Sequence, residues 1–407
     1  MGEPVRIGVL GKGTVGGAFA ALLGERADAV EAATGRRPEI CGTLSRSEGE
    51  FDEILARSEL IVELIGGTDP AREYVLAALR GGRPVVTANK QLLAQHGEEL
   101  FAAAREAGVQ LRFEAAVAGV IPIVRTIQES FGVTEIDKVF GIVNGTTNFI
   151  LSEMAATGTA YERVLARAQE LGYAEADPTD DVNGADAAAK MAILARLAFH
   201  TPVTLDQVAY EGIEAIQPDD LAYAKELGLS LKLLGVAERR DGGISVRVFP
   251  CFLYGGHPLA PVEGPFNAVM VEAPAITEVT MSGPGAGGVE TASAVLGDLV
   301  SIISGDAPAN EAHERLPLVA DVTSSFYLHL EVADQPGVLA RIAQVLGENE
   351  ISVKSVVQRG IGDDARLVMV VHECLESRFA AAVEEIGGLN EIRSQPRFIR
   401  VIEEEFV

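Results

Sequence analysis

The feature that most constrains the fold is a glycine-rich turn near the start of the chain. The apolar run VRIGVL is followed at once by GKGTVGG and then by the helical pattern AFAALLGER. Gly11 would make the tight turn, Gly13 would let the backbone approach a pyrophosphate, and Gly16 would let the helix pack closely on the strand. The phosphates would bind the first N–H groups of the helix, at Thr14 and Val15. A glycine-rich βα turn without any ligand is the alternative at this point.

Apolar β-runs and helical patterns then alternate through the first third of the chain. The further β-runs are PEICGTLSR, LIVELIGG, PVVTANK and VQLRFEAAV. Such alternation is typical of a parallel, doubly wound α/β sheet with right-handed crossovers, which binds ligands at the carboxyl ends of its strands. Those ends include Gly67 and Thr68 after the third run, Lys90 after the fourth and Glu114 in the fifth. We expect Lys90 to point into the same crevice as the glycine turn.

The end of the second β-run bears on the choice between NAD and NADP. NAD-preferring sites of this fold usually place an acidic residue there, which binds the ribose 2′-hydroxyl. This chain has Thr43, Leu44 and Ser45, followed by Arg46. Arg46 favours a 2′-phosphate and hence NADP. It could equally be a solvated loop residue, and NAD stays an alternative.

The pattern changes after about residue 133. The segment EIDKVFGIVNGTTNFIL predicts a strand that runs through a polar turn into a helix, and VRVFPCFLY, NAVMVEA and TEVTMSG read as later strands. We expect residues 1–133 to form a Rossmann nucleotide-binding domain and residues 134–285 to form an α+β domain that covers its crevice. The segment PGAGG, which contains Gly287, opens one more amphipathic helix at about 286–304. That helix is expected to return to the first domain and close the site.

The end of the chain reads as a third unit. Residues 305–323 are polar and show no period, which predicts a linker. Residues 324–407 then contain the β-runs FYLHLEVA, ISVKSVVQR, RLVMVVHE and RFIRVIE, with two helical patterns between them. This order predicts a separate βαββαβ module.

Composition excludes several classes of protein. With 407 residues, of which 48% are hydrophobic, the chain can bury a core in two or three domains. A formal net charge of −26 without a clustered excess of Lys and Arg argues against nucleic-acid binding. Cys41, Cys251 and Cys374 are widely separated, so neither a disulfide framework nor a zinc site is expected. The start of the chain has no secretory pattern, and the longest nearly apolar stretch is about half of the roughly 20 residues of a membrane span. We expect a cytoplasmic protein without membrane partners.

The segment with the most candidate catalytic side chains is GYAEADPTDDVNGADAAAKMAIL, which begins at Gly172. It places five carboxylates in a loop ahead of a helix, at Glu175, Asp177, Asp180, Asp181 and Asp186. Lys190 follows Asp186 by one helical turn, so both side chains share a face, and its other neighbours are Ala, Met, Ile and Leu. The alternative is an ordinary helix with a surface ion pair worth about 0.2–0.5 kcal/mol.

Taken together, these motifs resemble homoserine dehydrogenase of the long form, with a C-terminal ACT domain. The motifs GKGTVGG, ELIGG, TANK, NGTTN, GYAEADPTDDVNGADAAAK and DQPGVLARIA stand in the family's order and span nearly the whole chain. The resemblance implies reversible, NADP-linked interconversion of L-homoserine and L-aspartate 4-semialdehyde, in the biosynthesis of threonine, methionine and isoleucine. The chain departs from many relatives in CGTLSRSEGEF, which replaces a longer basic loop.

The resemblance also implies roles for single residues. Lys190 matches the family's proton donor, and Lys90 in TANK matches a lysine close to the nicotinamide and the substrate. The substrate pocket matches three acidic residues and a hydroxyl of the NGTTN turn: Glu175, Asp181, Asp186 and Thr146. The family also holds a sodium ion through main-chain oxygens of a turn that reads EAAVAGVIP here. The corresponding candidates are Glu114, Val117, Gly119 and Ile121.

For the ACT domain the resemblance implies an effector and a partner subunit. Modules of this type usually pair edge to edge and bind an amino acid at the pair interface, so we expect a homodimer or homotetramer. By pathway logic the effector would be L-threonine. The turn DQPG supplies the candidate residues, Asp334, Gly337 and Val338, because Gly337 permits a close backbone approach. A module that serves only stability or dimerisation is the alternative.

The proposed chemistry is the transfer of a hydride from the cofactor and of a proton to the developing alkoxide. Lys190 would donate the proton, while Glu175 and Asp181 would hold the substrate's ammonium group. Apolar neighbours would lower the pKa of Lys190 and Asp186 would oppose that shift, so the sequence leaves the balance open. Two other readings remain. A thioester-forming semialdehyde dehydrogenase needs a well-placed nucleophilic cysteine, and a non-catalytic amino-acid sensor need not keep Lys190 with its acidic loop.

Overall fold

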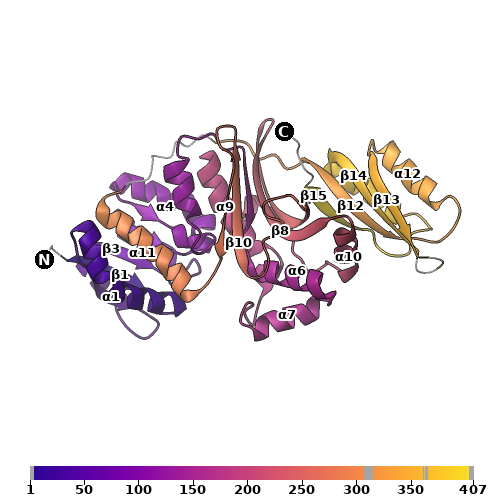
Figure 1. Cartoon of the computed structure of the whole chain (residues 1–407). Coiled ribbons are helices and arrows are strands. Elements are labelled where there is room, and N and C mark those ends of the chain that lie inside the picture. The colour runs from indigo at the N-terminus through magenta and orange to yellow at the C-terminus, as the bar shows by residue number, and fades with distance from the viewer. Residues whose placement is uncertain (1–3, 307–314, 361, 363–364, 403–407) are drawn as a thin grey trace.

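The computed structural model describes residues 4–306, 315–360, 362 and 365–402. Residues 307–314 of the expected linker, and the first three and last five residues of the expected terminal domains, lie outside these ranges. The described chain forms three parts in a row, with the N-terminal part at one end and the C-terminal part at the other (Figure 1).

The N-terminal part is a sheet of five strands in the order β2-β1-β3-β4-β5. The strands are β1 (Val5–Leu10), β2 (Pro38–Leu44), β3 (Leu60–Glu63), β4 (Val85–Thr87) and β5 (Leu111–Arg112). The helices between them are α1 (Thr14–Thr34), α2 (Phe51–Arg57), α3 (Ala71–Arg80) and α4 (Lys90–Ala107). All neighbouring strands run parallel, which confirms the doubly wound α/β sheet. Because β1 lies between β2 and β3, the glycine turn lies at the point where the strand order reverses.

Helix α11 (Gly288–Ser304) returns from the middle part to the first part, as the sequence predicts (Figure 1). It packs on α1, and its residues Ala292, Val295 and Leu299 share one buried cluster with Phe19 of α1. The core of the N-terminal part is thus completed by a segment from much later in the chain.

The fifth strand is shorter than the sequence predicts. The run VQLRFEAAV predicts one strand, but the structure replaces its second half with a short 3-10 helix, η1 (Glu114–Ala116). The reason lies in α11, because the N–H of Glu114 donates to the carboxylate of Asp298 at 2.7 Å and not to a neighbouring strand.

The middle part is built on long strands with helices between them. The strands are β6 (Lys138–Ile142), β7 (Ala209–Tyr210), β8 (Leu229–Arg240), β9 (Gly243–Tyr254), β10 (Phe266–Ala273) and β11 (Thr277–Pro284). The helices are α5 (Ile123–Arg125), α6 (Gly145–Thr157), α7 (Tyr161–Glu170), α8 (Thr179–Val182), α9 (Ala185–Phe199) and α10 (Pro218–Glu226), with the short helices η2 (Thr126–Ser130) and η3 (Leu205–Gln207). The sequence does not indicate β8 by alternation, because residues 231–238 are all buried.

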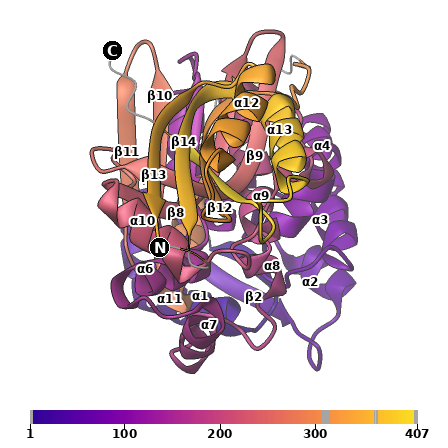
Figure 2. The ribbon, with the colours of Figure 1, turned by 90° about the vertical axis from the view of Figure 1, so that its right-hand side faces the viewer.

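The C-terminal part has the predicted βαββαβ order. Its elements are β12 (Thr323–Glu331), α12 (Val338–Glu348), β13 (Val353–Arg359), β14 (Arg366–Leu375), α13 (Glu376–Gly387) and β15 (Arg397–Ile402). It has its own buried cluster, and α12 and α13 lie side by side over its strands (Figure 2). Its strand β15 also pairs with β9 in parallel, so a single ten-stranded sheet joins the middle and C-terminal parts. The sequence does not predict this continuity.

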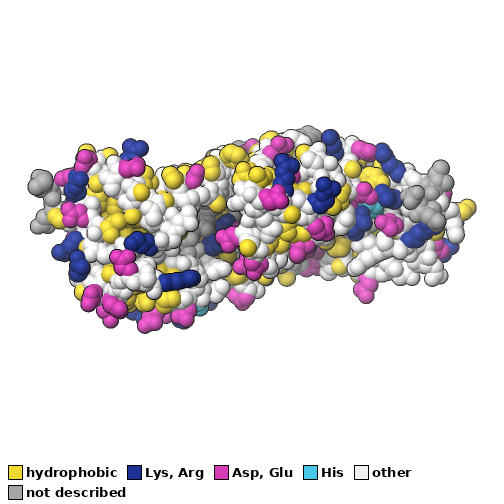
Figure 3. Space-filling model, turned by 90° about the horizontal axis from the view of Figure 1, so that it is seen from below, with side chains coloured by type: hydrophobic (Ala, Val, Ile, Leu, Met, Phe, Trp, Pro, Cys, Tyr) yellow, Lys and Arg dark blue, Asp and Glu magenta, His cyan; other side chains and the backbone are white. Residues whose placement is uncertain are grey.

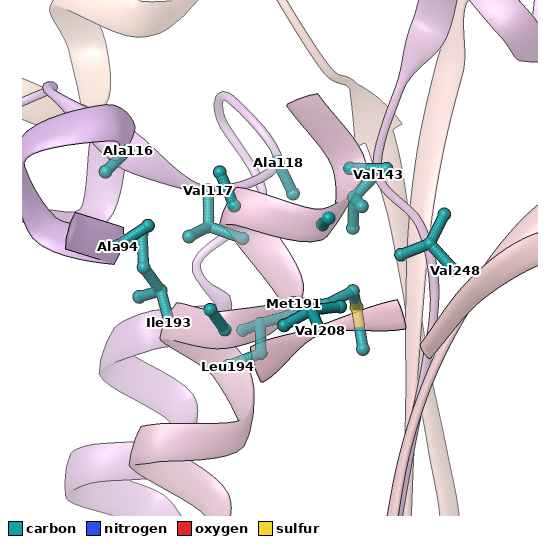
Figure 4. Packing of buried hydrophobic residues seen from close by; sticks show 14 of the residues in the cluster. Ala94, Ala116, Val117, Ala118, Val143, Met191, Ile193, Leu194, Val208 and Val248 are labelled. Carbon is teal, nitrogen blue, oxygen red and sulfur yellow. The ribbon is translucent and has the colours of Figure 1, made fainter. Parts of the chain in front are cut away.

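Helix α9 lies between α4 of the first part and the sheet of the middle part. Its side chains are buried around most of the helix, and Met191, Ile193 and Leu194 pack in a cluster with Val117 and Val143 (Figure 4). This packing fixes the helix rigidly at the junction of two parts. Any polar side chain on α9 therefore has a defined position between them.

Two features of the structure concern the sequence prediction that the protein binds neither nucleic acid nor membranes. On the face seen in Figure 3, acidic and basic side chains are interspersed, and that face has no large basic patch for nucleic-acid phosphates. Among the described residues, every helix is too short or too polar to cross a lipid bilayer.

Candidate active site

The glycine turn after β1 has the geometry of a phosphate-binding turn. Gly11 has a φ of +108°, and a Cβ atom there would lie 2.4 Å from the carbonyl oxygen of Leu64. A Cβ at Gly16 would lie 2.1 Å from the carbonyl oxygen of Gly11, so neither position admits a side chain. Gly13 faces open space, and α1 begins directly after it at Thr14. A phosphate group can therefore approach the N–H groups of the first helical turn.

A cavity of about 780 Å³ lies beside this turn. Gly11 and Gly13 line it together with Arg46, the residue expected to select the cofactor. Lys12 lines the same cavity, and its ammonium group lies 2.9 Å from the carboxylate of Glu48. The structure thus brings two basic side chains, only one of them indicated by the sequence, to the end of β2 and the glycine turn.

Two of the predicted cofactor residues lie elsewhere. Gly67 and Thr68 lie in the loop between β3 and α3, but in the described structure they are not among the residues that line the cavity. The carbonyl of Gly67 accepts a 2.6 Å hydrogen bond from the side chain of Asn89, and Thr68 lines a separate cavity beside α3 and α4.

A second cavity, of about 270 Å³, brings both candidate lysines together. Lys90, the first residue of α4, and Lys190 of α9 line it with Val15 of α1. Ala286 forms another part of its wall, directly before Gly287, which is the N-cap of α11. The loop before α11 therefore forms part of the wall of this cavity.

Lys190 forms a buried pair with Asp186, and the partly exposed Lys90 contacts the same carboxylate. Its ammonium group donates to the carbonyl of Val143 and to Oδ2 of Asp186, both at 2.7 Å. The ammonium group of Lys90 forms an ion pair with Oδ1 of the same carboxylate. The Asp186 side chain is only 4% exposed, so this pair is not the surface ion pair that the sequence left as an alternative. The Asp186 carboxylate is a buried anion that lies between two ammonium groups.

Burial and charge act in opposite directions within this group. Burial lowers the pKa of Lys190, and the charge of Asp186 only partly offsets that effect. Burial also disfavours the charge of Lys90, but there the attraction of Asp186 prevails and the pKa is raised. Burial would raise the pKa of Asp186, yet the two lysines outweigh it and lower that pKa. The two lysines therefore shift in opposite directions, the pKa of Lys190 downward and that of Lys90 upward.

The acidic loop contributes a second carboxylate, Asp181. Its Oδ1 accepts a 2.7 Å hydrogen bond from the side-chain amide of Asn144, and its Oδ2 lies 3.3 Å from the hydroxyl of Thr146. That hydroxyl also donates to the carbonyl of Tyr173 at 2.7 Å. Burial and the charge of Asp186 raise the pKa of Asp181. The NGTTN turn and the acidic loop therefore meet, as the resemblance implies.

Glu175 is exposed and lines a third cavity, of about 490 Å³, together with Asp181 and Lys90. Asp177 lines it too, but its Oδ1 accepts the N–H and the hydroxyl of Thr179 at 3.2 and 2.6 Å. Asp177 therefore shapes the loop, whereas Glu175 lines a cavity that also reaches Lys90.

Two buried polar residues near the site, Asn144 of the NGTTN motif and Glu63 of the ELIGG motif, received no role from the sequence. Asn144 is 4% exposed and donates to both acidic side chains of the site. Glu63 ends β3, is fully buried, and accepts the hydroxyl of Thr87 at 2.6 Å and the N–H of Ile65 at 2.7 Å. Burial raises the pKa of Glu63. A carboxylate at the end of an apolar run is a signal that could have identified Glu63, because such a group needs partners.

Comparisons with known proteins decide the family. The model of the homoserine dehydrogenase NAD-binding domain matches residues 11–114, the homoserine dehydrogenase model matches residues 122–300, and the ACT-domain model matches residues 327–391. A homoserine dehydrogenase from Corynebacterium glutamicum is 44% identical over 98% of this chain and 96% of its own. The chain belongs to the homoserine dehydrogenase family. It is an NAD(P)-dependent oxidoreductase that acts on a CH–OH group.

Solved homoserine dehydrogenases have the same fold. The crystal structure of a homoserine dehydrogenase from Thiobacillus denitrificans matches with a TM-score of 0.94 and 37% identity over 99% of both chains. A hyperthermophilic archaeal homoserine dehydrogenase in complex with NADPH matches with a TM-score of 0.66 and 25% identity, over 75% of this chain and 100% of its own. The predicted family and the predicted three-part fold are confirmed.

The resemblance to homoserine dehydrogenases implies a sodium ion in the turn EAAVAGVIP, which begins at Glu114. This turn is tightly folded. Its candidate ligands are Glu114, Val117, Gly119 and Ile121. Ala118 and Gly119 have φ values of +56° and +62°, and a Cβ at Gly119 would lie 2.6 Å from the backbone of Gly285. The carbonyl of Ile121 already accepts the N–H of Ile123 at 2.8 Å, which leaves one lone pair. No group of three or more His, Cys, Asp or Glu side chains suited to a metal occurs in the described ranges.

Glu114 also acts through its side chain. Its carboxylate accepts the N–H groups of Val124 and Arg125 at 2.8 and 2.9 Å. Burial and the charge of Asp298 raise its pKa to about 7. The side chain thus holds the end of this turn while its main-chain oxygen remains a candidate ligand.

The ACT domain of this homoserine dehydrogenase places the three effector candidates on one turn. Gly337 has a φ of +95° and directly precedes α12, whose first residue is the buried Val338. The carboxylate of Asp334 accepts the N–H of Gly362 at 3.0 Å. Asp334 therefore ties the turn after β12 to the segment that connects β13 and β14.

Proposed function

We propose that this chain catalyses the reversible, NADP-linked interconversion of L-aspartate 4-semialdehyde and L-homoserine. The observation that carries the proposal is the buried pair of Asp186 and Lys190, with the partly exposed Lys90 on the same carboxylate. Lys90 lines both the cavity beside the start of α1 and the cavity lined by Glu175 and Asp181. A cofactor in the first cavity, which Lys190 also lines, and an amino-acid substrate in the second would meet at Lys90.

The chain's own part in the reaction is to hold and move a proton. The bound dinucleotide supplies the hydride. Lys190 would hydrogen-bond the carbonyl oxygen of the aldehyde and donate its proton as the alkoxide forms, a role that typically contributes about 10²-fold to 10⁴-fold. The lowered pKa of Lys190 favours that donation. Asp186 would orient Lys190, and the charged Lys90 would stabilise negative charge that develops beside it.

Acidic side chains would hold the substrate's α-ammonium group. Asp181 and Glu175 line one cavity with Lys90, and each charge-assisted hydrogen bond would contribute roughly 1.5–3 kcal/mol. The hydroxyl of Thr146 lies 3.3 Å from Oδ2 of Asp181, at the edge of this pocket. This arrangement selects a substrate with a free amino group next to its reacting chain.

The proposed preference for NADP rests on basic side chains near the end of β2. Arg46 lines the cavity of the glycine turn, and no acidic residue takes the usual place of a 2′-hydroxyl ligand in the sequence from Thr43 to Ser45. The archaeal relative in complex with NADPH supports this choice.

A sodium ion is a further part of the proposal. The main-chain oxygens of Glu114, Val117, Gly119 and Ile121 would hold it, and oxygen ligands suit a hard monovalent cation. The support is the tight turn itself, in which Ala118 and Gly119 both take left-handed conformations. The ion would fix this turn next to the cavity that Gly119 and the two lysines line.

We further propose that the ACT domain binds an amino-acid effector, L-threonine, at Asp334, Gly337 and Val338. Feedback by threonine would suit an enzyme of threonine, methionine and isoleucine biosynthesis. A homodimer or homotetramer is proposed on the basis that such modules pair. A cytoplasmic location stays a prediction.

The two rival readings find less support. A thioester mechanism needs a reactive thiolate, but Cys251 is fully buried and burial raises its pKa to about 12. Burial likewise raises the pKa of Cys374 to about 11, and Cys41 lies on β2. A non-catalytic sensor has no need for Lys190 in a buried group beside the glycine turn.

One assay tests the proposal. NADPH oxidation is followed after addition of L-aspartate 4-semialdehyde, with and without L-threonine, and repeated with NADH. We expect substrate-dependent oxidation, faster with NADPH at low cofactor concentration, that threonine inhibits. Absence of any oxidation would overturn the proposed reaction, an equal response to both cofactors would overturn the NADP preference, and insensitivity to threonine would overturn the effector.

A further inference from the structure

We propose that Asn144 is a positioning residue whose amide group holds the carboxylates of Asp181 and Asp186 apart, so that one serves the lysines and the other serves the substrate. Asn144 lies between β6 and α6 and is 4% exposed. The inference rests on the proposed function for the roles of the two carboxylates. The geometry of the amide does not depend on it.

The orientation of the Asn144 amide is fixed by the start of α6. Its Oδ1 accepts the N–H of Thr147 at 2.9 Å and lies 3.0 Å from the hydroxyl of the same residue. Because the oxygen is used as the helix cap, the NH₂ group must face the opposite way. The assignment of oxygen and nitrogen is therefore determined by two independent sets of partners.

The NH₂ group then bridges the acidic residues. Nδ2 donates to Oδ1 of Asp181 at 2.7 Å and to Oδ2 of Asp186 at 2.8 Å. The two N–H bonds of a planar amide diverge at a fixed angle, so they set the separation of the two carboxylates. Among the hydrogen bonds of the described residues, this is the one donor that both carboxylates share.

The hydrogen bond from Asn144 to Asp186 also determines which carboxylate oxygen of Asp186 each lysine contacts. Oδ2 of Asp186 receives both Asn144 and Lys190, which leaves Oδ1 to face Lys90. Asp181 has no such lysine partner at hydrogen-bond distance among the described residues and keeps an oxygen for a substrate ammonium group. Its pKa is raised by burial and by the charge of Asp186, while the bond from Asn144 works against that rise.

The residue type at position 144 supports a positioning role in addition to the capping of α6. Serine, threonine and aspartate cap helices about as well as asparagine does. Only asparagine combines an acceptor for the helix with two donors for carboxylates. An ionised aspartate here would place a third negative charge beside Asp181 and Asp186, and a serine would have a single hydrogen to donate.

Two substitutions separate the two roles. Asn144→Ser keeps a helix cap but removes the bridge, and Asn144→Asp keeps size and cap but removes both donors. The control is Ser152→Ala, which removes a hydroxyl from the same helix that donates to the carbonyl of Asn148 at 2.7 Å, away from the carboxylates. Thermal unfolding verifies that all three variants remain folded.

We expect KM for L-homoserine to rise roughly tenfold or more in Asn144→Ser, because a charge-assisted hydrogen bond to the substrate's partner is lost. The dissociation constant for NADPH should stay unchanged. The acidic limb of the kcat/KM profile should move to higher pH, because Asp181 then takes up a proton more readily. Ser152→Ala should show neither effect. A variant with lower stability but an unchanged pH profile and unchanged KM would overturn the inference.

A second measurement separates this inference from the proposed reaction. The carboxyl carbon of Asp181 is followed by NMR in the protein labelled with ¹³C at aspartate, with no substrate present. Its pKa should be higher in Asn144→Ser than in the natural sequence and in Ser152→Ala. If the natural sequence shows no activity with the semialdehyde, the proposed reaction fails and this titration still decides the role of Asn144. Equal titration in all three proteins would refute it.

Discussion

The ammonium group of Lys190 lies 2.7 Å from the carboxylate of Asp186, one turn earlier on α9, and the two side chains are only 11% and 4% exposed. A buried lysine with a lowered pKa and a fixed orientation is suited to proton donation. The neighbouring Lys90 shares the same carboxylate but has a raised pKa. The two lysines thus differ in the ease with which each gives up a proton.

Replacement of Lys190 by alanine is expected to remove the proton donor. We expect kcat for semialdehyde reduction to fall at least about 10²-fold, with the dissociation constant for NADPH retained. Stopped-flow absorbance and a cofactor titration measure the two quantities. Lys225→Ala, at an exposed position of α10, is the charge-matched control and should behave like the natural sequence. Near-normal turnover of Lys190→Ala would rule out this role.

The substitution Asp186→Asn tests the balance of charges. Loss of the carboxylate removes the attraction that offsets burial, so the pKa of Lys190 should fall further. Reduction requires protonated Lys190, and the rate therefore falls as pH rises through its pKa. The alkaline limb of kcat for reduction should move to lower pH by about one unit or more. Asp177→Asn, in the turn with Thr179, serves as control. An alkaline limb that stays in place would show that Asp186 does not set the charge of Lys190.

The local pattern of the chain predicts much of this site. Lys190 and Asp186 could be paired from the sequence because they are one turn apart on a helix. The glycine turn and the βαββαβ order are likewise local. Asn144 shows no such signal, because its partners Asp181 and Asp186 lie 37 and 42 positions away and depend on how α6 and α9 pack.

The remaining differences from expectation also come from non-local contacts. Strand β8 shows no alternation of apolar and polar residues because it is buried on both faces. The pairing of β15 with β9 joins segments that are far apart in the chain, and no local sequence pattern encodes their register. The early end of β5 depends on Asp298 in α11, which captures the N–H of Glu114. Tertiary contacts therefore override the local β-propensity in that segment.

Arg46 should control the choice of cofactor. We expect Arg46→Glu to raise KM for NADPH far more than KM for NADH, because the 2′-phosphate would meet a negative charge in the cavity of the glycine turn. Initial rates at varied concentrations of both cofactors give the ratio. Arg26→Glu on α1 makes the same change of charge elsewhere on the domain and should leave the ratio unaltered. An unchanged ratio in Arg46→Glu would remove the basis for the NADP preference.

His257 should make the fold sensitive to mild acid. It is 4% exposed, its Nδ1 accepts the N–H of Leu259 at 3.1 Å, and burial lowers its pKa to about 4. Because the folded pKa lies below the ordinary value of 6.5, the stability contributed by the neutral ring is present above pH 6.5 and is lost as pH falls toward 4.

The substitution His257→Gln removes this titration. Between pH 7 and pH 5 the free energy of unfolding of the natural sequence should fall by about 2 kcal/mol more than that of the variant. Urea denaturation at several pH values measures the difference. His96→Gln, on α4, is the control. Parallel curves for His257→Gln and the natural sequence would contradict the buried neutral state.

The turn before α12 offers the last prediction, on regulation. A deletion of the ACT domain would also remove β15 from the edge of β9, so a point substitution is the cleaner test. We expect Asp334→Ala to raise the threonine concentration for half-maximal inhibition at least about tenfold, because it frees the turn from Gly362 and removes a polar ligand. Basal kcat and KM should be retained, since coupling between two sites can be lost without change at the catalytic one. Glu348→Ala, at the far end of α12, is the matched control. Undiminished inhibition of Asp334→Ala by threonine would place the effector elsewhere.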